Sequence, residues 1–207
     1  MAEHAVAEAP VPSGKTPSLE QLFARQLQRV TTLVHEAQNI DQLMLDISLD
    51  VCKLFNADRM TLYAVSAEGT AIVSKVKTGL ANTTELKLPI SVQSIAGFVA
   101  GQKKLLNIVD VYDEAALAKI HPELHFLQQV DKRSGYRTKQ MLVAPIIDRG
   151  DEQLYGVLQL INNRGDTPFG KFEEDGIRTL SNTLGAAIRQ RMGKPALEVL
   201  AGGKYDE

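Results

Sequence analysis

The residues whose types suit catalysis or metal binding are few in this sequence, and they lack the neighbours that such chemistry needs. Ser13-Gly14-Lys15-Thr16 resembles the end of a phosphate-binding loop, but Ala9 stands where that loop requires glycine. His121 and His125 are spaced to share a metal ion, yet no third ligand is near them. Cys52 stands among apolar residues, as a buried and unreactive thiol does. We therefore expect no catalytic residue and no metal site.

The segment 91–101 has a composition that suits anion binding through the backbone. It reads as a short helix with serine at its start and glycine at its end. Small residues at Ser94, Ala96 and Gly97 would let a ligand approach the main chain. The first turn of a helix offers N–H groups and the positive end of a dipole, which favour phosphate. The same residues also fit a plain capped surface helix, so this segment leaves both interpretations open.

Four cations occur close together between residues 132 and 139, namely Lys132, Arg133, Arg137 and Lys139. Such a group raises the local concentration of an anionic ligand. It is equally typical of the solvated side of a segment. These residues therefore support anion binding only together with other features.

Hydrophobic periodicity predicts the elements that would hold these residues in place. Long helices are expected near the two ends of the chain, over 19–38, from residue 39 or 41 to 55, and over 172–192. Shorter helices are expected over 91–101 and 123–133, with a linker or a short helix over 110–119. Extended segments are expected at 59–66, 70–77, 84–90, 105–109, 140–147 and 154–161.

This order of elements predicts an α+β fold with a central antiparallel sheet of about six strands. Strands and helices do not alternate regularly, which argues against a parallel sheet. We expect the long terminal helices to cover one face of the sheet. The short helices and loops would cover the other face and enclose a pocket.

The end of the chain carries a strand, a turn and an amphipathic helix in succession. The run 154–161 is apolar and rich in branched residues, and 162–170 contains the residues of a tight turn. Acidic residues at 173–175 then suit the start of a helix. Apolar residues follow at helical spacing, namely Ile177, Leu180, Leu184, Ile188 and Met192.

This stretch resembles the end of a GAF domain, the PAS-related sensor module of cyclic-nucleotide phosphodiesterases, some adenylyl cyclases and many bacterial regulators. The signature of the family there is Asn-Lys, a spacer, Phe, three residues and Asp-Glu. The matching residues are Asn162, Asn163, Phe169, Glu173 and Glu174. In the family, the lysine and the aspartate form a salt bridge. Asn163 cannot form it, so that contact is lost or replaced here.

A longer part of the chain resembles the phosphodiesterase and adenylyl cyclase-like branch of the same family. It comprises 95–100, 106–113 and 126–146, with the pattern Asp-x-x-Ser-Gly-Tyr-x-Thr from Asp131 to Thr138. Together with the closing stretch, the resemblance covers about residues 33 to 191. It implies the GAF fold and a buried pocket between the sheet and the middle helices.

In the cyclic-nucleotide-binding branch, the resemblance implies a set of ligand contacts. Backbone N–H groups would meet the cyclic phosphate, a loop would contact the base, and a helix with its following strand would close over the ligand. The corresponding residues are, in that order, Ile95 and Ala96, then Asp110 and Tyr112, then Ser134, Tyr136 and Thr138. Gln159 would present its amide to the pocket. Structural roles also fit, since Asp110 can cap a turn, Tyr136 can fill the core and Gln159 can bond to backbone.

Composition excludes several other classes of function and site. The chain has 207 residues, is 44% hydrophobic and carries a net charge of −2, which suits one well-filled core and gives no case for nucleic-acid binding. No apolar run is long enough to span a membrane. The single cysteine excludes an internal disulfide and a cysteine zinc cluster, and fits a cytoplasmic location.

The resulting plan has four parts: a disordered leader (1–18), a signalling or dimerisation helix (19–38), the GAF domain (39–192), and a linker (193–207) that precedes an output domain. The expected partner of the sensor is this output domain in the same longer chain, or a separate partner protein. We expect a homodimeric, non-enzymatic sensor that binds a small ligand, with a cyclic nucleotide as the candidate and no other cofactor. The alternative is a GAF-fold interaction module without a ligand. A third reading, a methionine sulfoxide reductase of this fold, needs resolving cysteines that Cys52 alone does not supply.

Overall fold

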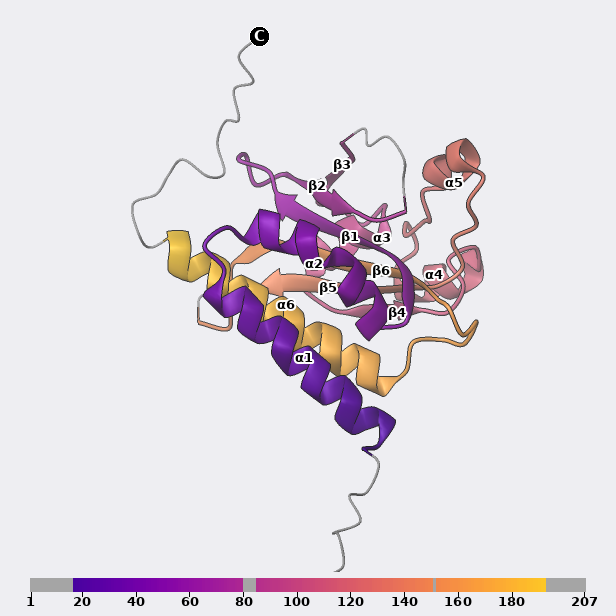
Figure 1. The fold of residues 1–207 in the computed structure, drawn as a ribbon. Coiled ribbons are helices and arrows are strands. Elements are labelled where there is room, and N and C mark those ends of the chain that lie inside the picture. Colours follow the sequence, from indigo (N-terminus) through magenta and orange to yellow (C-terminus); the bar gives the residue numbers. More distant parts are fainter. Residues whose placement is uncertain (1–16, 80–84, 151, 193–207) are drawn as a thin grey trace, which may run out of the picture.

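The computed structural model describes residues 17–79, 85–150 and 152–192. The helices are α1 (Leu19–Glu36), α2 (Ile40–Leu54), α3 (Ile95–Gln102), α4 (Glu114–Ile120), α5 (Gln129–Ser134) and α6 (Lys171–Met192). The strands are β1 (Ala57–Val65), β2 (Ala71–Lys77), β3 (Lys87–Pro89), β4 (Leu106–Ile108), β5 (Met141–Ile147) and β6 (Leu154–Asn163). Figure 1 shows their arrangement. The expected leader and linker lie outside the described residues, apart from Pro17 and Ser18, and so does the loop-like run 13–16.

The strands form one antiparallel sheet in the order β3-β2-β1-β6-β5-β4. Strand β6 lies inside the sheet, between β1 and β5, which explains its long apolar run. The predicted α+β class and the antiparallel six-stranded sheet are confirmed.

Helices α1, α2 and α6 cover one face of the sheet, and Figure 1 is viewed from their side. Helices α1 and α6 lie side by side and run in the same direction (Figure 1). Their first turns meet where Phe23 packs on Gly176, and a Cβ atom at Gly176 would lie 2.5 Å from the Phe23 ring. Near their ends, Arg191 Nη2 donates to the His35 carbonyl at 3.4 Å. The two helices through which the chain enters and leaves the domain are therefore packed as a pair.

A second hydrophobic core lies on the opposite face, between the sheet and the short helices α3 and α4 with the segments around them. This confirms the prediction that long terminal helices and short middle helices cover different faces.

The helix predicted over 123–133 is wrong in its extent. The structure has α4 before it, α5 at its end and an irregular segment between them. Asp113 caps α4 by accepting from the Ala116 N–H at 2.9 Å. Pro122 disfavours helical geometry at the preceding residue, and His121 is extended, with φ −157° and ψ 135°. The proline thus follows the end of one helix and does not begin the next.

The predicted starts of the first two helices are confirmed by their caps. Ser18 and Gln21 form a reciprocal capping box at α1. The Asn39 side chain accepts from the Gln42 N–H at 2.9 Å and caps α2.

Candidate functional site

A cavity of about 130 Å³ lies on the sheet face opposite α1 and α6. Its floor is formed by strands β1, β5 and β6, one wall by the start of α3, and the roof by the segment that leads through α5 into β5. The polar groups that line it are Arg59, Thr61, Tyr63, Thr78, Ser94, Gln129, Asp131, Arg133, Tyr136, Thr138 and Gln159.

Gln159 lies at the centre of the floor. It pairs across the sheet with Thr61 on β1 and Val143 on β5, so the three side chains share one face. Its side chain is 6% exposed and lines the cavity. Within the described part of the chain, the side-chain amide makes no hydrogen bond. Neither amide atom is among the fully enclosed unpaired side-chain atoms of the described residues, so the amide donors and acceptor open onto the cavity.

The start of α3 forms one wall. Ser94 caps this helix by accepting from the Gly97 N–H at 3.1 Å. Ile95 and Ala96 follow and line the cavity. Their N–H groups belong to the first turn, whose donors have no carbonyl partner within the helix. Gly97 itself is needed for packing, because a Cβ atom there would clash with the Pro89 carbonyl oxygen.

Asp131 organises the roof. Its buried carboxylate accepts three hydrogen bonds: from the Thr138 N–H and hydroxyl, each at 2.7 Å, and from the Tyr112 hydroxyl at 2.9 Å. Burial, and then the neighbouring carboxylate, raise the pKa of Tyr112. Arg137 covers the Tyr112 ring, with its Cζ 3.4 Å from the ring centre. Asp131 therefore ties α5 to the loop after β4 and to the start of β5.

Arg59 and Tyr136 close one side of the cavity. The Arg59 Cζ lies 3.4 Å above the centre of the Tyr136 ring, a cation–π contact. The Tyr136 hydroxyl donates to Asp58 at 2.6 Å and accepts from the Asn162 amide at 2.9 Å. Burial and the hydrogen bond to Asp58 raise the pKa of Tyr136 well above its usual range. The hydroxyl therefore stays neutral and keeps the proton that it donates to Asp58.

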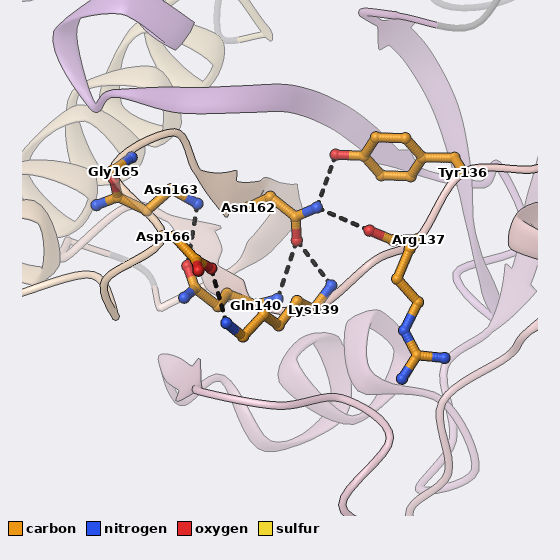
Figure 2. Close-up of polar contacts among 8 residues, drawn as sticks. All are labelled: Tyr136, Arg137, Lys139, Gln140, Asn162, Asn163, Gly165 and Asp166. Carbon is orange, nitrogen blue, oxygen red and sulfur yellow. Dashed lines mark hydrogen bonds and ion pairs between the residues drawn. The ribbon is translucent and has the colours of Figure 1, made fainter.

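Asn162, near the end of β6, joins this strand to the segment that enters β5, as Figure 2 shows. Its Oδ1 accepts from the N–H groups of Lys139 and Gln140 at 2.7 and 3.0 Å. Its Nδ2 donates to the Tyr136 hydroxyl and the Arg137 carbonyl, each at 2.9 Å. The residue has φ 51°, a left-handed conformation that asparagine tolerates better than most residues. The amide of Asn162, a residue of the family signature, thus uses all its donors and its acceptor in hydrogen bonds within the protein, beside the cavity.

The other signature residues make separate local contacts. Asn163 Oδ1 accepts from Asn56 Nδ2 at 2.9 Å and from the Gly165 N–H at 2.8 Å, and Glu173 accepts from the Gly170 N–H at 2.9 Å. No bond between Asn163 and Glu173 occurs in the described residues.

Asn107 provides a link between this turn and helix α6 that the sequence reasoning missed. Its Nδ2 donates to the carbonyl of the buried Phe169 and to Glu174, each at 2.8 Å. A neutral amide therefore connects the turn to the first turn of α6, where the resemblance implied a charged pair. The sequence did contain a signal for this link, since Asn107 is the one polar residue between the apolar residues of the short strand β4.

The structure brings five of the eight expected ligand residues to the cavity, namely Ile95, Ala96, Tyr136, Thr138 and Gln159. The other three do not line it. Asp110 accepts from the Tyr112 N–H at 2.9 Å and caps a turn, Tyr112 bonds to Asp131, and the Ser134 hydroxyl donates to the Val130 carbonyl at 2.8 Å. Arg59 and Asp131 line the cavity although the sequence reasoning assigned neither of them. Asp131 stands inside the quoted pattern, which was the signal for it.

The groups first considered for other chemistry have ordinary surroundings. Cys52 is fully buried, and burial raises the pKa of its thiol. His125 bonds to Glu114 at 2.9 Å, while the His121 ring packs near Phe98. A group of three metal-ligating side chains does not occur in the described ranges. None of the helices described has the length and apolar character that crossing a membrane requires.

Comparison with known proteins identifies the family. The sequence profile of the GAF domain matches residues 39–188. The chain belongs to the GAF-domain family. The expected resemblance to the GAF family is thereby confirmed, and this family consists of regulatory sensor domains.

Curated relatives of this GAF domain are cyclic-nucleotide phosphodiesterases. A probable 3′,5′-cyclic phosphodiesterase of Caenorhabditis elegans is 26% identical over 82% of this chain and 25% of its own length. A dual 3′,5′-cyclic-AMP and -GMP phosphodiesterase of Takifugu rubripes is 30% identical over 70% of this chain and 16% of its own length. The chain therefore spans a quarter or less of these relatives.

Solved structures support the fold. The GAF domain of a phosphoenolpyruvate-protein phosphotransferase from Coxiella burnetii superposes with a TM-score of 0.69, at 23% identity, over 87% of this chain and all of that chain. This likeness concerns the fold alone.

Proposed function

We propose that this GAF domain binds a small ligand in the cavity over the sheet, that the ligand is a cyclic nucleotide, and that the domain itself catalyses no reaction. The observation that carries the proposal is Gln159, a residue only 6% exposed whose side chain lines the cavity and makes no hydrogen bond to the described residues. A ligand in the cavity therefore meets amide donors and an acceptor that no protein group in the described residues occupies.

The polar groups around Gln159 match the parts of such a ligand. The amide has both donors and an acceptor, so it pairs with the edge of a purine base. The N–H groups of Ile95 and Ala96, at the positive end of α3, suit the cyclic phosphate. Arg59 adds a positive charge at the cavity edge. Asp131 is not assigned to the ligand, because its carboxylate already accepts from three protein donors and its charge opposes that of a phosphate.

The cavity must widen to accept a nucleotide. Its volume of about 130 Å³ is below the roughly 300–1,000 Å³ of ordinary ligand pockets. The Arg59–Tyr136 contact closes one side, and such contacts are worth about 0.5–2 kcal/mol. Release of Arg59 from this ring is the smallest movement that enlarges the cavity, and it frees the guanidinium for the phosphate.

The terminal helices carry the output. Helices α1 and α6 run side by side (Figure 1), so a change in the angle of one moves the other. Exposed apolar side chains occur at their starting ends, where Leu19 is 85% and Phe172 is 52% exposed. We propose that these residues form a homodimer contact and that the signal passes to an output domain in the same chain or a partner protein in the cytoplasm.

A dimerisation or interaction module without a small ligand is the second candidate. It is favoured by Leu45 and Leu49 on α2, which are 54% and 62% exposed and lie one turn apart. If this candidate holds, the cavity stays empty, and substitution of these leucines removes the activity of the full-length protein.

Calorimetry with cyclic AMP, cyclic GMP and the two corresponding nucleosides tests the proposal. We expect saturable binding of at least one cyclic nucleotide and affinity for its nucleoside at least about tenfold weaker, because the nucleoside lacks the anion that meets α3. Lys139→Ala is the matched control, since this cation points to Asp166 and does not line the cavity. Absence of binding of both cyclic nucleotides at millimolar concentration contradicts the proposal and leaves the interaction module.

A further inference from the structure

A second cavity lies at the edge of the sheet, beside α6 and away from the cavity that contains Gln159. Its volume is about 320 Å³. Three segments form it: the turn between α3 and β4, the second half of β5, and the middle of α6. The lining residues are Lys103, Lys104, Leu105, Ala144, Pro145, Ile147, Arg178 and Asn182. We name this cavity the edge cleft.

Pro145 explains why the edge cleft exists. Leu106 on β4 pairs with Val143 on β5, so continuation of the same register would place Lys104 opposite Pro145. Proline has no N–H to donate, and the ladder ends before it. The chain turns away there, with Lys103 in a left-handed conformation at φ 52°. The uncovered edge of β5 becomes the apolar floor of the cleft.

The edge cleft carries positive charge on two of its three sides. Lys103 and Lys104 come from the turn, and Arg178 comes from α6. None of the lining residues is acidic. Lys103 Nζ donates to the Glu152 carbonyl at 2.7 Å. In the described ranges, the side chains of Lys104, Arg178 and Asn182 make no hydrogen bond or ion pair.

The acidic residues that should neutralise Arg178 have other partners. Helical neighbours three or four residues away are the usual source of ion pairs. At these positions stand Asp175, which pairs with Lys171 at 2.8 Å, and Glu174, which accepts from Asn107 at 2.8 Å. Nearby Asp148 pairs with Arg189 at 2.7 Å. The guanidinium therefore remains available to an anion from outside the chain.

We propose that the edge cleft is a second ligand site, which binds a small phosphomonoester with an apolar body. Arg178 and Lys104 hold the phosphate oxygens, with Lys103 close enough to add charge, and the Asn182 amide donates a further hydrogen bond. Leu105, Ala144 and Pro145 contact the apolar body. The volume is at the lower end of the roughly 300–1,000 Å³ of ligand pockets. A dianion suits three cations better than a carboxylate does.

A bound phosphomonoester would connect α6 to the turn between α3 and β4. Substitution of Gln159 leaves the edge cleft intact, because the two cavities share no lining residue. The site thus provides a second input to α6, whether or not the first cavity binds a cyclic nucleotide.

Titration of ¹⁵N-labelled protein with phenyl phosphate at physiological ionic strength tests the proposal. We expect saturable shifts of the Asn182 side-chain amide and of the backbone signals of Lys104 and Leu105. Inorganic phosphate is expected to bind more weakly at the same signals because it lacks the apolar body. Benzyl alcohol, which lacks the anion, is expected to cause no saturable shift. Shifts that fail to saturate, or that leave Asn182 unmoved, overturn the proposal.

Variants of exposed residues separate a site from general attraction of anions. Arg178→Ala and Lys104→Ala are each expected to weaken phenyl phosphate binding at least about tenfold. Arg178→Lys is expected to weaken it less, because lysine keeps the positive charge but lacks the paired N–H donors of the guanidinium. Lys75→Ala, an exposed cation on β2, is the matched control and is expected to leave the affinity unchanged. Equal effects of Lys75→Ala and Arg178→Ala would reduce the result to an adventitious ion effect and overturn the proposal. Gln159→Leu is expected to bind phenyl phosphate as the original protein does.

Discussion

Two side-chain amides stand three residues apart on strand β6 and have opposite surroundings. Asn162 makes four hydrogen bonds with its amide, to the Lys139 and Gln140 N–H groups, the Tyr136 hydroxyl and the Arg137 carbonyl. Gln159 is 6% exposed and its amide makes none within the described residues. An amide whose donors and acceptor are all bonded within the protein stabilises the fold, whereas one that opens onto a cavity without protein partners is free to bond a ligand. The difference separates a structural residue from a binding residue on the same strand.

The largest loss of stability is expected at Asn162. Asn162→Ala leaves the Lys139 and Gln140 N–H groups without their acceptor and places alanine at φ 51°. We expect the free energy of unfolding to fall by about 3 kcal/mol, measured by urea denaturation. Asn162→Gly is the control, since it removes the amide but tolerates the backbone. An unchanged midpoint for Asn162→Ala would contradict the structural role.

The next largest effect is expected at Asp131. Asp131→Asn turns one of the two acceptor oxygens into a donor that faces the Thr138 and Tyr112 groups. We expect a loss of about 2 kcal/mol by the same measurement, and weaker protection of the α5 segment against hydrogen exchange. Ser134→Ala is the matched control, since this hydroxyl bonds only to its near neighbours in sequence, the Val130 carbonyl and the Tyr136 N–H. Equal exchange rates in Asp131→Asn and the original protein would show that the roof is held by other contacts.

At Gln159 the sign of the stability change is expected to reverse. Gln159→Leu replaces an unpaired buried amide with an apolar side chain of similar size. We expect stability to be unchanged or to rise by up to about 1 kcal/mol, while affinity for the cyclic nucleotide falls at least about tenfold. A loss of stability as large as that of Asn162→Ala would mean that Gln159 is a structural residue.

The smallest effect concerns Cys52. Burial raises the pKa of this thiol above its ordinary value, so the folded protein holds the proton more tightly than the unfolded chain. The reactive thiolate is therefore suppressed in the folded state, and the related stabilisation is lost as the pH rises through the pKa of the unfolded thiol and on to that of the folded one. We expect alkylation by iodoacetamide at pH 8 to be at least about tenfold slower in buffer than in urea. Equal rates would point to an accessible, reactive cysteine.

The sequence predicted the fold closely because its patterns are local. The apolar run of β6, the caps at Ser18 and Asn39, and the two long amphipathic helices each follow from neighbouring residues. The predicted extent of the helix at 123–133 was wrong because Pro122 follows the end of α4 and does not begin a helix. Proline is common both at the first position of a helix and just after its end, so the sequence alone does not decide between the two.

The site was predicted only in part because its contacts join segments far apart in the chain. The resemblance placed Tyr112 at the ligand, but its hydroxyl reaches Asp131, nineteen residues later. Arg59 was missed because its position on the cavity edge depends on Tyr136, which lies 77 residues away in sequence (136 − 59). Such pairings depend on the packing of strands and loops, and no spacing within one segment encodes them.

The side-chain amide signals of Gln159 and Asn162 give the most direct test of the difference between them. In a ¹⁵N-labelled sample titrated with cyclic GMP and then cyclic AMP, we predict that the Gln159 side-chain signals shift and saturate with at least one nucleotide. The Asn162 side-chain signals, fixed by four hydrogen bonds, are predicted to stay in place. Movement of Asn162 with Gln159 unmoved, or no movement of either at saturating nucleotide, would contradict the assignment of ligand binding to Gln159.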